Sequence, residues 1–290
     1  MAREKIVRAG KHVWTVFVYI FAAVGFVLVV GYFALRFGFT KVPGIIDLQR
    51  QAFIGSATTS TAAVINQAPE YPKGTPWQDT QEWQVLSAAI TKDTSVINQA
   101  ATTSGVPARL IVANLIVEQL RLFFTERGFY EQFFAPLKIL GSQTQFSWGV
   151  MGMKEATAVQ VENNLKNPTS PYYLGPQYEH LLDLSATATT SIEQQRFIRM
   201  TDQHQHYYNY LYAGLYIREI ENQWQNAGFP ITNRPDVIST LYNIGFEHSM
   251  PNANPQVGGA AIVINGVTYS FGGLANQFYQ SDLLTNIFPK

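Results

Sequence analysis

The stretch SGVPARLIVANLIVEQLRLFF, at residues 104–124, decides the fold. It is apolar on most faces of a helix and contains few polar residues, so it predicts a helix that is buried on nearly all sides. Ser104 is a candidate N-cap for this helix, and Pro107 falls in its first turn, where proline is well tolerated. We therefore expect a globular domain packed around residues 104–124.

The sequence on both sides of this helix is also helical in pattern. The segment EWQVLSAAITKDTSVINQA precedes it, and the helical segments that follow are separated by clusters such as KNPTSPYYLGP at residues 166–176. Strand patterns are nearly absent until GAAIVINGVTYSFGG at residues 259–273, in which Asn265-Gly266 is the usual two-residue hairpin turn. The sequence thus predicts a mainly α domain over residues 77–290 with a small C-terminal β-hairpin.

The N-terminal region has a different composition. From Val13 to Leu35 no residue is charged, and the run is apolar on every helical face. At 1.5 Å per residue the run spans roughly 35 Å, which exceeds a hydrocarbon core of about 30 Å. A cleaved signal peptide has a shorter apolar stretch, followed by a small-x-small site. The run therefore predicts a transmembrane helix over residues 12–36.

Charge predicts the orientation of this helix. Residues 1–11 carry four basic side chains, which predicts a cytoplasmic tail by the positive-inside rule. Everything after the helix is then extracytoplasmic and faces the periplasm or the cell wall. Residues 37–76 are rich in Gly, Pro, Ser, Thr and Ala and predict a linker between the membrane and the main domain.

Charge balance and residue types exclude several classes of protein. The chain has 20 basic and 20 acidic residues, but residues 1–41 hold six bases and one acid, so residues 42–290 carry a net charge of −5. Such a domain lacks the basic face that a nucleic-acid binder needs. The absence of cysteine excludes disulfides, thiolate metal sites and a cysteine nucleophile. The sequence has no phosphate-loop motif and no zinc motif. We expect His204 and His206 to belong to an aromatic helix face and not to a metal site. No cofactor and no metal are therefore predicted.

Glu118 is the candidate catalytic residue of the central helix. A carboxyl group presented from an apolar helix is partly desolvated, which favours its neutral form and raises its pKa, as a general acid near neutral pH requires. The alternative is a structural ion pair between Glu118 and Arg121, which follows one turn later. The helix alone leaves both interpretations open.

Three motifs, read together, carry a resemblance to a known family. They are GVPARLIVANLIVEQ at 105–119, SWGVMGMKEATA at 147–158, and the pair AGLYIREIENQW at 213–224 and DVISTLYNIG at 236–245. In this order they resemble the lytic transglycosylases of the lysozyme-like superfamily, which cut the glycan strands of bacterial peptidoglycan. The resemblance covers roughly residues 105–250 of this sequence and implies a lysozyme-like helical domain.

The resemblance assigns roles to individual residues. It implies that Glu118 is catalytic and that five further motif residues bind the sugar, namely Ser147, Gly149, Met151, Tyr242 and Asn243. Two positions depart from the family pattern, because Gly152 stands where the family has glutamine and Gln119 where it commonly has serine. These departures concern the fine substrate contacts, whereas Glu118 itself is present.

The implied reaction cleaves the bond between N-acetylmuramic acid and N-acetylglucosamine with one carboxyl group used twice. Glu118 first protonates the glycosidic oxygen and then takes a proton from the C6 hydroxyl, which closes on C1 to give a 1,6-anhydro sugar. Glu126 and Glu131 are the candidates if a second carboxylate takes part, as in two-carboxylate glycosidases. The implied partners are peptidoglycan strands, the membrane, and cell-wall or secretion machinery.

Three alternatives stay open at this point. One is a hydrolytic lysozyme (muramidase) of the same fold, in which water replaces the C6 hydroxyl. Another is a non-catalytic peptidoglycan-binding scaffold of an envelope or secretion machine, for which Gly152 and Gln119 are the sequence hints. The third is a phage- or secretion-associated factor that pierces the wall with the same chemistry.

Overall fold

The computed structural model describes residues 19, 21, 71–126, 147–186, 190–202 and 204–290. The chain divides into two compact units, and all of these residues except Tyr19 and Phe21 belong to the larger unit, Gly44–Arg127 with Ser142–Lys290. The predicted cytoplasmic tail, the transmembrane helix over 12–36 except for Tyr19 and Phe21, and most of the linker over 37–76 lie outside the described residues, so they stay predictions.

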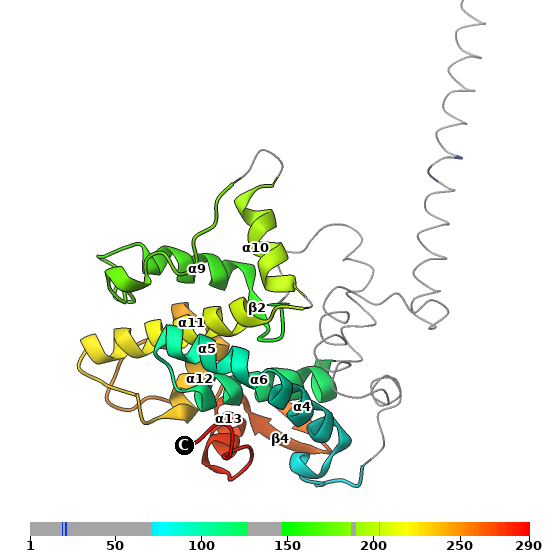
Figure 1. The fold of residues 1–290 in the computed structure, drawn as a ribbon. Coiled ribbons are helices and arrows are strands. Elements are labelled where there is room, and N and C mark those ends of the chain that lie inside the picture. The colour runs from blue at the N-terminus through cyan, green and yellow to red at the C-terminus, as the bar shows by residue number, and fades with distance from the viewer. Residues whose placement is uncertain (1–18, 20, 22–70, 127–146, 187–189, 203) are drawn as a thin grey trace, which may run out of the picture. The chain divides into compact units, whose positions relative to one another are not determined.

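The described part of the larger unit is mainly helical, as the sequence predicts (Figure 1). Its α-helices are α4 (Gln81–Lys92), α5 (Thr94–Ser104), α6 (Ala108–Arg121), α9 (Glu155–Leu165), α10 (Ile192–Thr201), α11 (Tyr207–Asn226), α12 (Pro235–Ile244) and α13 (Phe271–Gln280). Short 3₁₀ turns lie at Trp77–Asp79, Pro176–Tyr178 and Phe246–His248, and α6 continues into a π-helical turn, Leu122–Glu126. The strands are β1 (Ser147–Trp148), β2 (Met153–Lys154), β3 (Ala261–Ile264) and β4 (Val267–Ser270).

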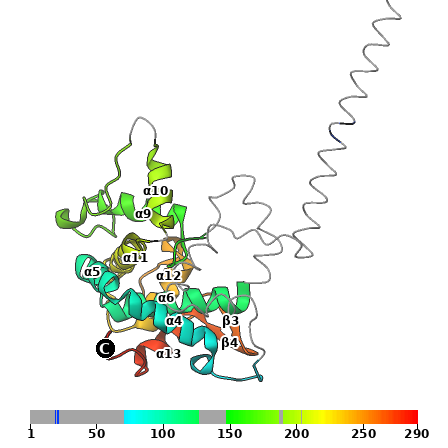
Figure 2. The same cartoon turned by 45° about the vertical axis from the view of Figure 1, so that its right-hand side comes forward.

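Helix α6 is the centre of the core. Every residue from Arg109 to Leu120 is buried, because α4, α5, α11, α12 and α13 all pack against this helix. Figures 1 and 2 show α11 between α6 on one side and α9 with α10 on the other. Each buried leucine or isoleucine of such a helix stabilises the fold by about 1.5–3 kcal/mol. The prediction of a helix buried on nearly all sides is confirmed.

The start of α6 differs from the sequence prediction. Ser104 is the last residue of α5 rather than the N-cap of α6, and its hydroxyl donates to the carbonyl of Ala100 at 2.8 Å. Gly105 ends α5 in the left-handed conformation, with φ 73°, which L side chains rarely adopt. Pro107 then stands at the N-cap position of α6, without a side-chain capping bond. The Ser104 prediction was wrong because the serine bonds back into its own helix.

The predicted C-terminal hairpin is present. Strands β3 and β4 are antiparallel, with Ile264 opposite Val267 and Asn265-Gly266 between them (Figure 2). Both turn residues have positive φ, 49° and 77°, as a type I′ turn requires. The β-rich pattern extends to residue 273, but α13 begins at Phe271 because the Ser270 hydroxyl caps it by accepting from the Gly273 amide at 3.2 Å.

The hairpin turn also holds the chain that enters the domain. The Gly74 amide donates to the Asn265 carbonyl at 2.7 Å, and the Asn265 side chain donates to the Thr75 carbonyl at 3.0 Å. The Tyr71 hydroxyl donates to Glu82 at 3.0 Å. Residues 71–76, which the sequence places in the linker, are therefore bonded to the domain.

A second, smaller ribbon escapes the sequence analysis. Strands β1 and β2 pair in an antiparallel register, with Trp148 opposite Met153. The turn between them, residues 149–152, contains two glycines with positive φ, Gly149 at 68° and Gly152 at 62°. Strands of two residues are too short to show the alternating pattern by which a strand is recognised.

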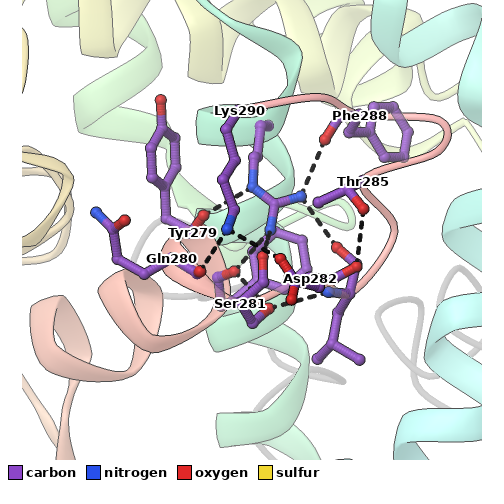
Figure 3. Close-up of polar contacts among 10 residues, drawn as sticks. Tyr279, Gln280, Ser281, Asp282, Thr285, Phe288 and Lys290 are labelled. Carbon is purple, nitrogen blue, oxygen red and sulfur yellow. Dashed lines mark hydrogen bonds and ion pairs between the residues drawn. The ribbon is translucent and has the colours of Figure 1, made fainter.

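The beginning of α6 is joined to the end of the chain by Arg109 (Figure 3). Its guanidinium group is buried and donates five hydrogen bonds, of 2.7–3.0 Å, to backbone carbonyls. The acceptors are the carbonyls of Phe278, Tyr279, Ser281, Leu283 and Phe288. Because a guanidinium group has five N–H donors, Arg109 satisfies all of its own bonding capacity with the C-terminal segment.

Within the described residues, no single helix is both long and apolar enough to cross a bilayer. The segments Thr94–Ser104 and Ala108–Phe124 meet that criterion only as a pair, with a bend of 119° between them.

Candidate active site

Glu118 lies in the last turn of α6 and is buried. Its Oε2 atom accepts from Nη2 of Arg121 at 2.8 Å, and the two side chains are 5% and 17% exposed. The ion pair that the sequence offers as an alternative role for Glu118 is therefore present. Directly after Arg121 the helix widens into the π-helical turn Leu122–Glu126, a deformation that is frequent at functional sites.

The turn at residues 149–152 packs its backbone on the Glu118 carboxylate. A Cβ atom added to Gly152 would stand 2.8 Å from Glu118 Oε2 and 3.0 Å from its Cδ, closer than real Cβ atoms approach. The φ of 62° at this position is a second reason for glycine. Gly152, which the sequence analysis treats as the loss of the family's glutamine, is thus the residue that lets the turn approach the carboxylate.

Gln119 fastens this turn to α6. Its side-chain amide donates to the carbonyl of Val150 at 2.6 Å, and both residues are buried. In the described part of the chain, Gln119 Oε1 is also buried and has no hydrogen-bond partner. The second departure from the family pattern is therefore a cross-link between the helix that carries Glu118 and the turn that covers it.

Tyr242, from α12, completes the contacts around this turn. Its hydroxyl donates to the carbonyl of Met151 at 3.0 Å, so its proton is committed to the turn. Burial raises the pKa of Tyr242 well above 10, and the charges of Glu118 and of Tyr216 raise it further. Tyr242 and Glu118 thus both contact the 149–152 turn, Tyr242 through Met151 and Glu118 through Gly152. A phenol with so high a pKa stays neutral and serves as a hydrogen-bond donor.

The structure brings three of the predicted site residues together. Glu118, Met151 and Tyr242 come from α6, the 149–152 turn and α12, and they meet at this turn, where Gly152 contacts Glu118 and the Met151 carbonyl accepts from Tyr242. Met151 takes part through its backbone carbonyl, whereas its side chain is fully buried in the core. Of Ser147 the structure describes only the backbone, which pairs with Lys154 in the β1–β2 ribbon.

Two predicted sugar-binding residues have protein neighbours instead. A Cβ atom on Gly149 would overlap the side chain of Asn209 and stand 2.7 Å from the Met200 carbonyl, so the space beside this glycine is filled by the protein. The Asn243 side-chain oxygen accepts from the Ala260 amide at 2.7 Å, ahead of β3. Close packing explains why position 149 holds a glycine, and the Asn243 side-chain oxygen is bonded to the loop before β3.

The two histidines of the HQHYYNYLY segment are not on a helix, contrary to the sequence prediction. Helix α11 begins at Tyr207, and His206 occupies its N-cap position. The buried His206 Nδ1 lies 2.6 Å from Asp93 Oδ2, which also accepts from the Tyr210 hydroxyl at 2.8 Å. This cluster ties the junction of α4 and α5 to the start of α11.

Among the second-carboxylate candidates, Glu131 lies outside the described residues, and only the backbone of Glu126 is described.

Comparison with known proteins adds no relative: no protein-family model, no curated protein and no solved structure matches this chain. The chemistry of the site rests on its own geometry. A buried carboxyl group is held between a guanidinium group and a glycine backbone, beside a neutral phenol. A carboxyl group in such surroundings can donate and accept a proton at one fixed place.

Proposed function

We propose that the protein cleaves the glycan strands of peptidoglycan by lytic transglycosylation, with Glu118 as the catalytic acid and base. The observation that carries this proposal is the meeting of three motifs at the 149–152 turn beside the Glu118 carboxyl group. Glu118 ends the buried helix, the Met151-Gly152 backbone covers it, and Tyr242 bonds to that backbone. These are the three motifs that resemble the lytic transglycosylases, and they lie far apart in the sequence.

In the proposed reaction the carboxyl group ends as it began. Protonated Glu118 gives its proton to the glycosidic oxygen as the bond from that oxygen to C1 of N-acetylmuramic acid breaks. The carboxylate then accepts the proton of the C6 hydroxyl while the oxygen of that hydroxyl bonds to C1. No water is consumed, and the products are a 1,6-anhydromuramic end and a free N-acetylglucosamine end. Proton transfer by a positioned carboxyl group typically contributes about 10²–10⁴-fold in rate.

The rest of the proposal concerns fold and location. The helical domain is proposed to be lysozyme-like, with α6 as the helix that presents the catalytic glutamate. Residues 12–36 are proposed to anchor it in the cell membrane, with the N-terminus in the cytoplasm and the domain on the side of the wall. A tether near its polymer substrate raises the effective concentration of a domain whose net charge gives it little long-range attraction to that polymer.

The test compares the full-length wild-type protein with Glu118→Gln on purified peptidoglycan. Wild type is expected to release muropeptides with 1,6-anhydro ends, detected by mass spectrometry, and Glu118→Gln to release at least about 10²-fold less. Glu193→Gln is the matched control, because Glu193 is an exposed glutamate in the first turn of α10. Products with reducing ends instead of anhydro ends would make the enzyme a muramidase, and equal release by Glu118→Gln would remove Glu118 from the reaction.

The ion pair of Glu118 favours one other function, a non-catalytic peptidoglycan-binding scaffold. A carboxylate that is 5% exposed and already bonded to Arg121 can serve as a structural group. In that case wild type and Glu118→Gln would both sediment with insoluble peptidoglycan without releasing fragments. The same pair of proteins therefore separates the two functions.

A further inference from the structure

Arg121 is the feature of the site that the proposed reaction leaves unexplained. It stands one helical turn after Glu118, with Nη2 at 2.8 Å from Glu118 Oε2. Its side chain is 17% exposed, against 5% for the Glu118 side chain. Among the described residues the other titratable group close to Glu118 is Tyr242 of α12, and the 149–152 turn contains none.

The oxygen that Arg121 holds is enclosed on a second side by the turn. Gly152 faces the same atom, Glu118 Oε2, which leaves no room there even for a methyl group. Tyr242 gives its proton to Met151, so it does not supply a proton to this oxygen. The Arg121 cation is thus the charged group in contact with this side of the carboxyl group.

This arrangement opposes the first step of the reaction. A cation in contact with a carboxyl group favours its ionised form, typically lowering a carboxyl pKa by about 1–3 units. A general acid has to carry a proton when the substrate arrives. The contact with Arg121 therefore stabilises the form of Glu118 that serves the second step, at the expense of the form that serves the first.

We infer that Arg121 is a positioning residue that keeps Glu118 ionised in the resting protein and thereby limits glycan cleavage to acidic conditions. The inference rests on the proposed function in that it takes Glu118 to be the acid. In the working cycle, protonation of Glu118 releases the guanidinium group, and the return of Arg121 after bond cleavage favours the carboxylate that accepts the C6 proton.

The first experiment measures the charge of Glu118 without any need for activity. Full-length protein carrying an isotope label on its glutamate carboxyl carbons is titrated by NMR, and the Glu118 signal is identified by its loss in Glu118→Gln. We expect its titration midpoint to rise by at least about one pH unit in Arg121→Gln and to stay near the wild-type value in Arg121→Lys. Arg218→Gln is the matched control, because Arg218 contacts Glu221 at the same i,i+3 spacing but at 3.8 Å and on another helix.

The second experiment measures cleavage of purified peptidoglycan against pH. Wild-type activity should fall as pH rises through the Glu118 midpoint, and Arg121→Gln should move this fall to higher pH by the same amount as the NMR shift. At a pH above both midpoints the variant would then be up to about tenfold faster than wild type for a one-unit shift. Arg121→Met, which keeps the apolar stem of the side chain, provides a second variant if thermal unfolding shows that Arg121→Gln is misfolded.

The outcomes are distinguishable. An unchanged Glu118 midpoint in both folded variants overturns the inference and leaves the proposed function standing. If the midpoint shifts in the Arg121 variants but wild type itself cleaves no glycan, the charge role of Arg121 is supported and the proposed function is overturned. If wild type cleaves glycan and the Arg121 variants lose turnover at every pH despite a shifted midpoint, Arg121 is a substrate contact and the inference is overturned.

Discussion

Near its beginning α6 carries Arg109, and in its last turn it carries Glu118, so one helix buries two opposite charges. Arg109 uses its five N–H groups on five backbone carbonyls of the C-terminal segment. Glu118 has Arg121 as its cationic partner, from the same helix, and a glycine turn against the same oxygen.

The two charged groups differ in how the protein surrounds a charge with a structural role and a charge with a proposed catalytic role. The Arg109 contacts come from a distant segment of the chain and satisfy the whole group, so they connect α6 to the C-terminus and leave no capacity for a ligand. The surroundings of Glu118 are local, partly exposed through Arg121, and depend on a left-handed glycine. Backbone of this kind persists at functional sites because the surrounding structure holds it.

Replacing Arg109 should have the largest effect on this comparison. Arg109→Met keeps most of the volume but removes five hydrogen bonds to backbone carbonyls, those to Phe278 and Phe288 being buried and the other three part-buried. We expect this loss to lower the free energy of unfolding by about 3–5 kcal/mol. Chemical denaturation of the purified protein measures the change. Arg109→Lys should recover part of it, because lysine keeps the charge but has three donors. A loss below about 1 kcal/mol for Arg109→Met would mean that the C-terminal segment is held by its apolar contacts.

Replacing Gly152 should have the next largest effect, and it acts at the other end of α6. Gly152→Ala adds left-handed strain of about 1–2 kcal/mol and pushes a methyl group into Glu118 Oε2, so we expect a loss of roughly 2–3 kcal/mol together with reduced glycan cleavage. Gly228→Ala is the matched control, since Gly228 has φ 83° and nothing within 4 Å of an added Cβ atom. If the two variants lose equal stability and keep equal activity, Gly152 does not shape the site.

The fold was predictable from the sequence where a pattern is long or chemically specific. Residues 104–124 are apolar on most faces, which predicts the buried α6, and Asn265-Gly266 predicts the type I′ turn of β3–β4. The β1–β2 ribbon was not predictable, because two-residue strands carry no alternation. Ser104 was misassigned because a serine before a proline-containing helix start suits an N-cap and a preceding helix end equally well.

The candidate site was predictable only in part, for a different physical reason. Motif order singled out Glu118 and Tyr242, and both contact the 149–152 turn in the structure. The surroundings of Gly149 and Asn243 depend on Asn209 and Ala260, which belong to other segments and leave no local signal in the motif. The role of Gln119 likewise depends on its distant partner Val150. The signal that could have pointed to the site is the pair of glycines within one four-residue turn, since both have positive φ.

At pH 4 the smallest effect on stability is expected at Glu219. This buried carboxyl group can be compared with Glu118, because it accepts a hydrogen bond from an amide, whereas Glu118 accepts one from a cation. Glu219 Oε2 accepts from the Asn164 amide at 3.0 Å, and in the described part of the chain its buried Oε1 has no hydrogen-bond partner. Burial raises the pKa of Glu219 well above 4.5, which the Asn164 hydrogen bond only partly offsets. Glu219 is therefore protonated in the folded protein across a range of pH in which it is ionised in the unfolded chain.

The sign of the pH dependence follows from proton counting. Above pH 4.5 the folded state binds more protons than the unfolded state, so the contribution of Glu219 is complete below that pH and is lost as pH rises through the raised pKa. Glu219→Gln removes this loss, because an amide does not ionise; at pH 4 it should change stability by less than about 1 kcal/mol. Melting temperatures from pH 4 to pH 9 should then fall less steeply in Glu219→Gln than in wild type. Glu221→Gln is the comparison variant, because burial raises the pKa of Glu221 to about 7 against the opposing charge of Arg218. The stability that this substitution recovers should therefore grow with pH between about 4.5 and 7 and stay constant at higher pH. A Glu219→Gln profile parallel to wild type would show that Glu219 ionises at its ordinary pKa.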